Sequence, residues 1–330
     1  MGISNVEKLF DWIDKTSEQF GEHQNVTYLE GLVDAMGIMY SQEVPNDIDD
    51  ILAQKLKTTL SQIHIEQYEK EEIRKAIQLA IIKGMKDSTQ AQHLLTPEAI
   101  ALIIGYLADK FTEGWKSLRI FDPVSGTGNL LFTVLDRLKN KETETFASEV
   151  DPTLIQLAVT SANLLEKEIE FFRQDSLSPF LLDPVDLVVA DLPVGYYPDD
   201  IRARDFKLRA DEGHSFAHHL LIEQSLRYTK DSGILIFIIP ESLFSSGQSE
   251  KLNEFLREHA HILGLLQLPD TAFKSKNNHK SILILQKKGE HTTGVKQPLL
   301  VQVPSFKNKN AMADILGQMN AWFKTYHTNK

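Results

Sequence analysis

A glycine-containing turn follows a mostly apolar segment near the middle of the chain. Residues 118–121 precede Asp122, and Gly126-Thr127-Gly128 comes four residues after that acid. The glycines permit a tight turn and let a ligand lie against the main chain. The helix expected from Asn129 onward has free N–H groups at the same end of the strand. This pattern predicts a small-molecule site, although a plain strand-to-helix turn without a ligand has the same residues.

Two nucleotide-like ligands compete for such a turn. A dinucleotide site has a third glycine where this chain has Leu131, so that the pyrophosphate lies on the helix N-terminus. Asp122 also precedes the glycines, where it repels a pyrophosphate and attracts an ammonium group. S-adenosylmethionine carries an ammonium and a sulfonium and has no phosphate. The residues therefore favour S-adenosylmethionine over NAD.

Two further acids stand at the predicted ends of the next strands. Glu149 lies about 20 residues beyond the glycines, where a carboxylate can accept hydrogen bonds from ribose hydroxyls. Asp175, followed by Ser176, ends the third strand, where it can accept from an adenine amino group. Because the carboxyl ends of parallel strands converge, we expect Asp122, Glu149 and Asp175 to line one site.

The fourth predicted strand ends in a rigid loop flanked by aromatic residues, Asp191-Leu192-Pro193-Val194-Gly195-Tyr196-Tyr197. Together with Thr96-Pro97, Asp122-Pro123-x-x-Gly-x-Gly, Glu149 and Asp175, this loop resembles the motif order of the N6-adenine DNA methyltransferases. The resemblance covers roughly residues 93–288 and is strongest to the modification subunit of type I restriction systems.

The resemblance implies S-adenosylmethionine as the cofactor and assigns residues to two roles. The implied cofactor-binding residues are Thr96, Asp122, Pro123, Gly126, Gly128, Asn129, Leu130, Glu149, Val150, Asp175, Ser176 and Asp191. The implied catalytic residues are Asp191, Leu192, Pro193, Tyr196 and Tyr197. In the family, the loop receives a flipped-out base, and a side chain and a backbone carbonyl accept hydrogen bonds from the N–H groups of its amine.

The loop departs from the family pattern at three positions. Asp191 replaces an asparagine but still accepts N–H bonds. Leu192 replaces a proline, and Val194 replaces the aromatic residue that stacks on the base. Tyr196 or Tyr197 can replace that aromatic residue, or both can simply pack the loop.

The remaining pattern predicts an α/β protein with two parts. Residues 1–92 have helical periodicity and no strand signal, with a polar joint at 87–92, and residues 93–330 form the methyltransferase domain. Thr96, Pro97 and Glu98 predict a helix start with a hydroxyl cap. Candidate strands are 118–121, 145–148, 170–172, 187–190, 234–239, 264–268 and 281–286. We expect a Rossmann-like, mostly parallel seven-stranded sheet in which the last two strands pair antiparallel.

Composition limits the partners. The net charge is −11, so we expect the chain alone to bind DNA weakly and to need a specificity subunit or another protein, because no target-recognition domain fits after residue 289. A basic cluster, Arg202, Arg204, Lys207 and Arg209, either contacts phosphates or is a solvated charge run.

The absence of cysteine excludes disulfides and thiolate metal sites, and the 11 histidines suggest no metal site. His218-His219 fits a helix packed on the sheet better than a metal site. No membrane or secretory segment is evident, which predicts a cytoplasmic protein.

The sequence thus predicts a class I methyltransferase that acts on the N6 amine of adenine. Two alternatives stay open. The acceptor can be an amine or amide in RNA or on a protein glutamine, or the departures at Leu192 and Val194 can mark a cofactor-binding scaffold that has lost catalysis.

Overall fold

The structure is a computed structural model that describes residues 4–86, 95–273 and 279–328. Residues 4–86 fold into α1 (Asn5–Gln24), α2 (Tyr28–Ser41), α3 (Asp50–Leu60), a short turn η1 (Ile65–Gln67) and α4 (Lys70–Lys86). Ser4 with Glu7 and Thr27 with Glu30 form capping boxes that begin the first two helices. The predicted boundary after residue 92 and the polar joint at 87–92 lie outside the described residues.

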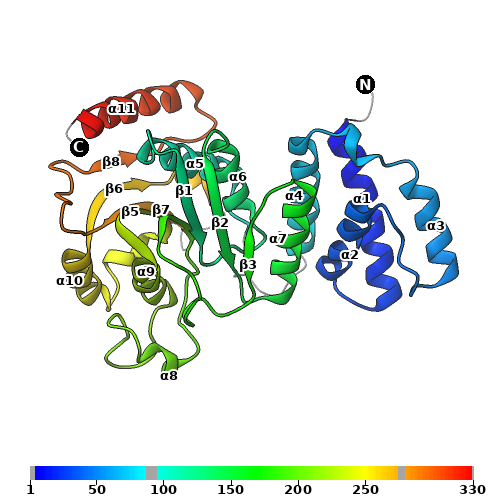
Figure 1. The fold of residues 1–330 in the computed structure, drawn as a ribbon, viewed down its shortest axis with the longest axis horizontal. Helices are drawn as coiled ribbons and strands as arrows, with labels where there is room; N and C mark the ends of the chain where they lie inside the picture. Colours follow the sequence, from blue (N-terminus) through cyan, green and yellow to red (C-terminus); the bar gives the residue numbers. More distant parts are fainter. Residues whose placement is uncertain (1–3, 87–94, 274–278, 329–330) are drawn as a thin grey trace.

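An eight-stranded sheet forms the centre of the molecule (Figure 1). Its strands are β1 (Ser117–Asp122), β2 (Glu142–Ser148), β3 (Glu170–Phe172), β4 (Val185–Asp191), β5 (Thr229–Pro240), β6 (Ala260–Gln267), β7 (Lys280–Lys287) and β8 (Leu299–Gln302). Their spatial order is β3-β2-β1-β4-β5-β7-β6-β8. Only β7 runs antiparallel to its neighbours β5 and β6. The predicted mostly parallel sheet with one antiparallel strand is confirmed.

The eighth strand is the difference from the predicted seven. β8 pairs in parallel with β6, from Gly264 opposite Leu299 to Gln267 opposite Gln302. It has only four residues, and Leu299 alone is fully buried. So short a segment carries no clear alternation of apolar and polar residues, so its sequence does not identify it as a strand.

Helices cover both faces of the sheet. On one face lie α5 (Glu98–Phe111), α6 (Asn129–Arg137) and the C-terminal α11 (Lys309–Thr328), packed on alternate β5 residues such as Ile236. On the other face, α9 (Ala217–Arg227) and α10 (Ser249–His259) pack on the intervening residues such as Phe237. Every β5 residue from Gly233 to Pro240 is buried, and successive side chains face opposite helical layers, which produces a three-layer core.

The helical N-terminal region joins the sheet domain near its β3 edge. In Figure 1, α7 (Pro152–Leu164) stands beside α4, with α1, α2 and α3 beyond it. Leu154 and Leu157 of α7 share a buried cluster with the N-terminal helices. The remaining short elements are α8 (Asp200–Ala203), η2 (Glu241–Phe244) and η3 (Asp270–Ala272). None of the helices in the described ranges is long and apolar enough to cross a bilayer.

Candidate functional site

The carboxyl ends of the parallel strands bring three acidic side chains together. Asp122 ends β1 and Asp191 ends β4, and Glu149 follows β2 directly. Asp122 is 1% exposed, and its Oδ1 accepts a hydrogen bond from the Val124 N–H (3.0 Å). Burial raises the pKa of the Asp122 carboxyl well above its usual range; the Val124 N–H opposes this, and the nearby Glu149 and Asp191 carboxylates raise it further. A cation bound beside this carboxyl would favour its ionised form, whereas a bound anion would disfavour that form further, so the site suits a cation.

The glycine turn between β1 and α6 has the backbone conformation that the sequence predicts. Gly126 has φ 54° and Gly128 has φ 84°, in the left-handed region that favours glycine. A Cβ on Gly128 would lie 2.4 Å from the Phe132 ring, whereas one on Gly126 would meet nothing within 4 Å. Gly128 is also the N-cap of α6, so the free N–H groups of that helix face the end of β1.

Glu149 ties the glycine turn to the end of β2. Its Oε2 accepts the Gly126 N–H (2.9 Å), and its Oε1 accepts the N–H groups of Val150 and Asp151 (both 2.9 Å). These bonds fix the plane of the carboxylate. A carboxylate has about four acceptor positions, so it still has room for a ribose hydroxyl. The Val150 side chain is exposed beside it.

Asp175 and Ser176 connect the end of β3 to the neighbouring turns. The Asp175 carboxylate accepts the Leu177 N–H (2.9 Å) and the Tyr197 hydroxyl. The Ser176 hydroxyl is buried and donates to the Pro123 carbonyl. Burial and the Asp175 carboxylate raise the pKa of Tyr197, so its phenol stays a proton donor.

Asp191 is held by two donors from distant parts of the chain. Thr96 Oγ1 donates to its Oδ2 (2.9 Å), and Lys280 Nζ donates to its Oδ1 (2.5 Å). The predicted hydroxyl cap at Thr96 is therefore wrong: α5 begins at Glu98 with Pro97 as its N-cap and no side-chain cap, because the hydroxyl bonds Asp191 instead. Lys280 was not among the predicted residues.

The loop after Asp191 separates its two tyrosines. Leu192 is fully buried, and its N–H donates to the Ile238 carbonyl (3.0 Å). Tyr197 is 7% exposed, whereas Tyr196 is 62% exposed and stacks on Phe216 with ring centroids 4.9 Å apart. Pro193 and Val194 are exposed. The buried Tyr197 packs the loop, and only Tyr196 presents a ring to solvent there.

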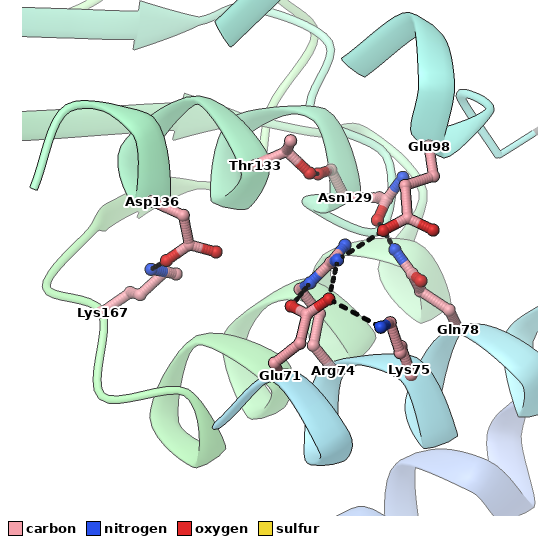
Figure 2. A network of polar contacts seen from close by, with 9 residues as sticks. All are labelled: Glu71, Arg74, Lys75, Gln78, Glu98, Asn129, Thr133, Asp136 and Lys167. Carbon is pink, nitrogen blue, oxygen red and sulfur yellow. Dashed lines mark hydrogen bonds and ion pairs between the residues drawn. The ribbon is translucent and has the colours of Figure 1, made fainter. Parts of the chain in front are cut away.

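The N-terminal helices contact this site through polar side chains (Figure 2). The Asn129 amide accepts from Gln78 of α4 and donates to the Thr96 carbonyl (2.8 Å). Arg74 of α4 is 7% exposed and donates to Glu71 and, at 2.8 Å, to Glu98 at the start of α5. The Asn129 side chain thus bonds protein groups, and the Leu130 side chain lies in the core. Sequence reasoning missed Arg74 and Gln78.

The remaining predicted polar features are the histidine pair and the basic cluster, and His218 lies against the backbone of Pro193 in the loop after Asp191. His218 and His219 are buried in α9 against the sheet, as predicted for a packed helix. Burial lowers the pKa of His218 to about 4 and that of His219 to about 3. Lys207 of the basic cluster is within 3.7 Å of Glu258. Within the described ranges, no group of three or more His, Asp or Glu side chains could hold a metal ion.

Two family models match the chain. Residues 7–85 match the YtxK N-terminal helical domain, and residues 84–322 match the N-6 DNA methylases. The uncharacterised protein YtxK of Bacillus subtilis (strain 168) is 46% identical over 327 residues, which are 98% of this chain and 99% of that protein.

Solved structures give the same fold. A Listeria monocytogenes protein provisionally assigned to the class I S-adenosylmethionine-dependent methyltransferases superposes with a TM-score of 0.91 at 38% identity, covering 97% of this chain and 99% of its own. The modification subunit of a type I restriction enzyme from Vibrio vulnificus, also provisionally assigned, has a TM-score of 0.65 at 16% identity, covering 89% of this chain and 65% of its own. At that identity the second likeness concerns the fold alone.

Proposed function

Because this chain belongs to the N-6 DNA methylase family, we propose that it is an S-adenosylmethionine-dependent methyltransferase that methylates the N6 amine of adenine in DNA. The single observation that carries the proposal is the meeting of Asp122, Glu149 and Asp191 at the carboxyl ends of β1, β2 and β4. When ionised, these groups offer only acceptors, and the ligand that they suit is cationic and rich in donors.

The residues at this site fit S-adenosylmethionine. Asp122 is a buried carboxyl among other carboxylates, so it gains from a neighbouring ammonium or sulfonium. We assign Glu149 to the ribose hydroxyls and Asp175 with Ser176 to the adenine; the Gly126 N–H fixes the Glu149 carboxylate, the Leu177 N–H fixes that of Asp175, and the Gly126 turn leaves open space against the main chain. When bound, the cofactor supplies an electrophilic methyl group on sulfur.

The protein groups around Asp191 act on the acceptor amine. The lone pair of an exocyclic adenine amine is delocalised into the ring, so the amine is a poor nucleophile until its N–H bonds are held out of plane. The Asp191 carboxylate and the Leu192 carbonyl accept hydrogen bonds from those N–H groups. The bound cofactor would supply the methyl group, and the Asp191 carboxylate would take up the proton that the amine loses when it is methylated. Positioning supplies much of the rate.

We assign the stacking role to Tyr196 rather than Tyr197. Tyr196 is exposed beside Val194, which stands where relatives of this type have an aromatic residue, while the Tyr197 hydroxyl is bonded to Asp175. Stacking of a base on an aromatic ring contributes roughly 1 to 3 kcal/mol. Because the chain has a net charge of −11, we further propose that it needs a partner, such as a specificity subunit, to bind DNA tightly.

Transfer of radiolabel tests the proposal. The chain is incubated with S-adenosylmethionine labelled in its methyl group and with DNA, RNA and a protein extract, and the fractions are separated. We expect label in DNA as N6-methyladenine, lost in Asp191→Ala with cofactor affinity within about tenfold of wild type. Label in RNA or on protein glutamine would move the acceptor to those classes. Label in no fraction, with the cofactor bound, would leave a scaffold that lacks catalysis.

A further inference from the structure

Lys280 places a hydrogen-bond donor directly beside the acceptor that the proposed reaction uses. Its Nζ lies 2.5 Å from Asp191 Oδ1, and the two side chains are 19% and 17% exposed. Thr96 holds the other carboxylate oxygen at 2.9 Å. The carboxylate is therefore fixed in orientation, and the ammonium is fixed next to it.

The backbone on both sides of this pair is held by the sheet. Asp191 is opposite Ile238 in the β4–β5 pair, and Lys280 is opposite Pro240 in the β5–β7 pair. The Lys280 carbonyl also accepts the Leu268 N–H (3.3 Å). Groups mounted on strands keep their geometry better than groups on loops. The pair is thus a rigid feature of the site.

The pair retains capacity for a ligand. An ammonium has three N–H donors, and Asp191 is the only acceptor of Lys280 Nζ among residues 4–86, 95–273 and 279–328. The Asp191 carboxylate has about four acceptor positions, of which Thr96 and Lys280 use two. Acceptor and donor therefore stand side by side, each with free positions.

This arrangement complements a particular chemical edge. Adenine presents an N6 amine that donates and, one carbon away, a ring nitrogen N1 that only accepts. An aliphatic amine has no such acceptor beside it. A glutamine amide presents the same order, but the exposed Tyr196 ring, stacked on Phe216 in the same loop, suits a planar base.

We propose that Lys280 determines acceptor specificity by donating to N1 of the target adenine while Asp191 accepts from its N6 amine. This inference rests on the proposed function and deepens it. The positive charge beside Asp191 selects an unprotonated ring nitrogen next to the amine, and Lys280 orients the base so that the amine faces the carboxylate.

Binding of matched oligonucleotides tests the inference. Three labelled single-stranded oligothymidylates carry at their centre adenine, 1-deazaadenine (in which a C–H replaces N1) or thymine, and S-adenosylhomocysteine is kept saturating so that no base enters the cofactor site. Affinity is measured by fluorescence anisotropy for wild type, Lys280→Met and Lys280→Arg. We expect wild type to prefer adenine over 1-deazaadenine by about ten- to hundredfold, as for a charged hydrogen bond. We expect the preference to fall within about threefold in Lys280→Met and to return in part in Lys280→Arg.

Lys230→Met is the matched control. Lys230 pairs with Asp186 at 2.8 Å near the opposite end of β4, so its loss removes a similar ion pair away from the site. It should leave the preference for adenine unchanged. Melting temperatures and cofactor affinity of each variant show whether it is folded.

The outcomes separate this inference from the proposed function. Equal binding of all three oligonucleotides by wild type, or an adenine preference that survives in Lys280→Met, overturns the role of Lys280. A Lys280-dependent adenine preference without transfer of labelled methyl groups supports the inference while the proposed function fails.

Discussion

Replacing Arg74 with methionine tests how the N-terminal helices support the cofactor site. Arg74 lies on α4 and donates to Glu71 (2.8 Å) and to Glu98 (2.8 Å) at the start of α5, one residue beyond Pro97 and two beyond Thr96. Its side chain is 7% exposed, but Glu71 and Glu98 are 50% and 43% exposed. Methionine keeps the apolar stem and removes every donor.

The magnitude follows from these exposures. Breaking a fully buried ion pair costs about 3–5 kcal/mol, because the remaining charge stays buried. Here both carboxylates regain water, and two partly exposed pairs at roughly 0.2–1 kcal/mol each give a destabilisation of about 0.4–2 kcal/mol. This corresponds to a fall in melting temperature of roughly 1–8 °C for a domain of this size. We also expect S-adenosylmethionine to bind about three- to tenfold more weakly, since the start of α5 beside Thr96 loses its ion pair with α4.

Lys75→Met is the matched control, and calorimetry with thermal melting is the assay. Lys75 follows Arg74 and binds the same Glu71 at 3.2 Å, but it is 46% exposed, so its loss should cost less than about 0.5 kcal/mol and leave cofactor affinity unchanged. If Arg74→Met matches Lys75→Met in both measurements, α4 does not support the site in the way that Figure 2 suggests.

Three further predictions concern single residues. Folding raises the pKa of Asp122, so the folded state holds that proton more tightly than the unfolded chain, and stability falls as pH rises above 3.8. Asp122→Asn should remove this fall in melts from pH 4 to 8 and should weaken S-adenosylmethionine binding more than tenfold. Unchanged affinity would contradict the role assigned to Asp122. Gly128→Ala should lower the free energy of unfolding, measured in urea, by about 2–4 kcal/mol, because φ at this position is positive and the new methyl group would contact Phe132. Gly126→Ala should lower it by only about 1 kcal/mol, because its φ is positive but no atom lies within 4 Å. Equal costs would refute this reasoning. Burial lowers the pKa of His219 to about 3 in the folded state, so the stability that its neutral ring contributes is complete above about pH 6.5 and is lost as pH falls toward 3. His219→Leu should therefore lose less stability than wild type between pH 6.5 and 4.5. Parallel curves of stability against pH for the two proteins would argue against burial as the cause.

Much of the site could be predicted because its residues lie at strand ends. The alternation of strands and helices places the carboxyl ends of parallel strands together, so the sequence predicts that Asp122, Glu149 and Asp175 lie at one edge of the sheet, with the loop that begins at Asp191 beside them. The glycine turn follows from a local backbone requirement at Gly126 and Gly128.

The parts that could not be predicted depend on non-local pairing. Lys280 reaches Asp191 only because β7 lies antiparallel next to β5, so that its first residue is at the same edge of the sheet as the last residue of β4. Gln78 bonds a residue 51 positions away, and nothing in the α4 sequence specifies that partner. The Thr96 hydroxyl bonds the distant Asp191 carboxylate rather than capping the helix that begins next to it, and local sequence rules for helix caps do not predict that contact. β8 was too short to show a periodic pattern.

Calorimetric titration of the purified chain with S-adenosylmethionine tests the central claim most directly, because the carboxylates at the ends of β1, β2 and β4 are assigned to that ligand before any acceptor is involved. We predict micromolar affinity at one site per chain, roughly 7 to 9 kcal/mol of binding free energy, with NAD far weaker. No binding of S-adenosylmethionine at millimolar concentration, or tighter binding of NAD, would contradict the account.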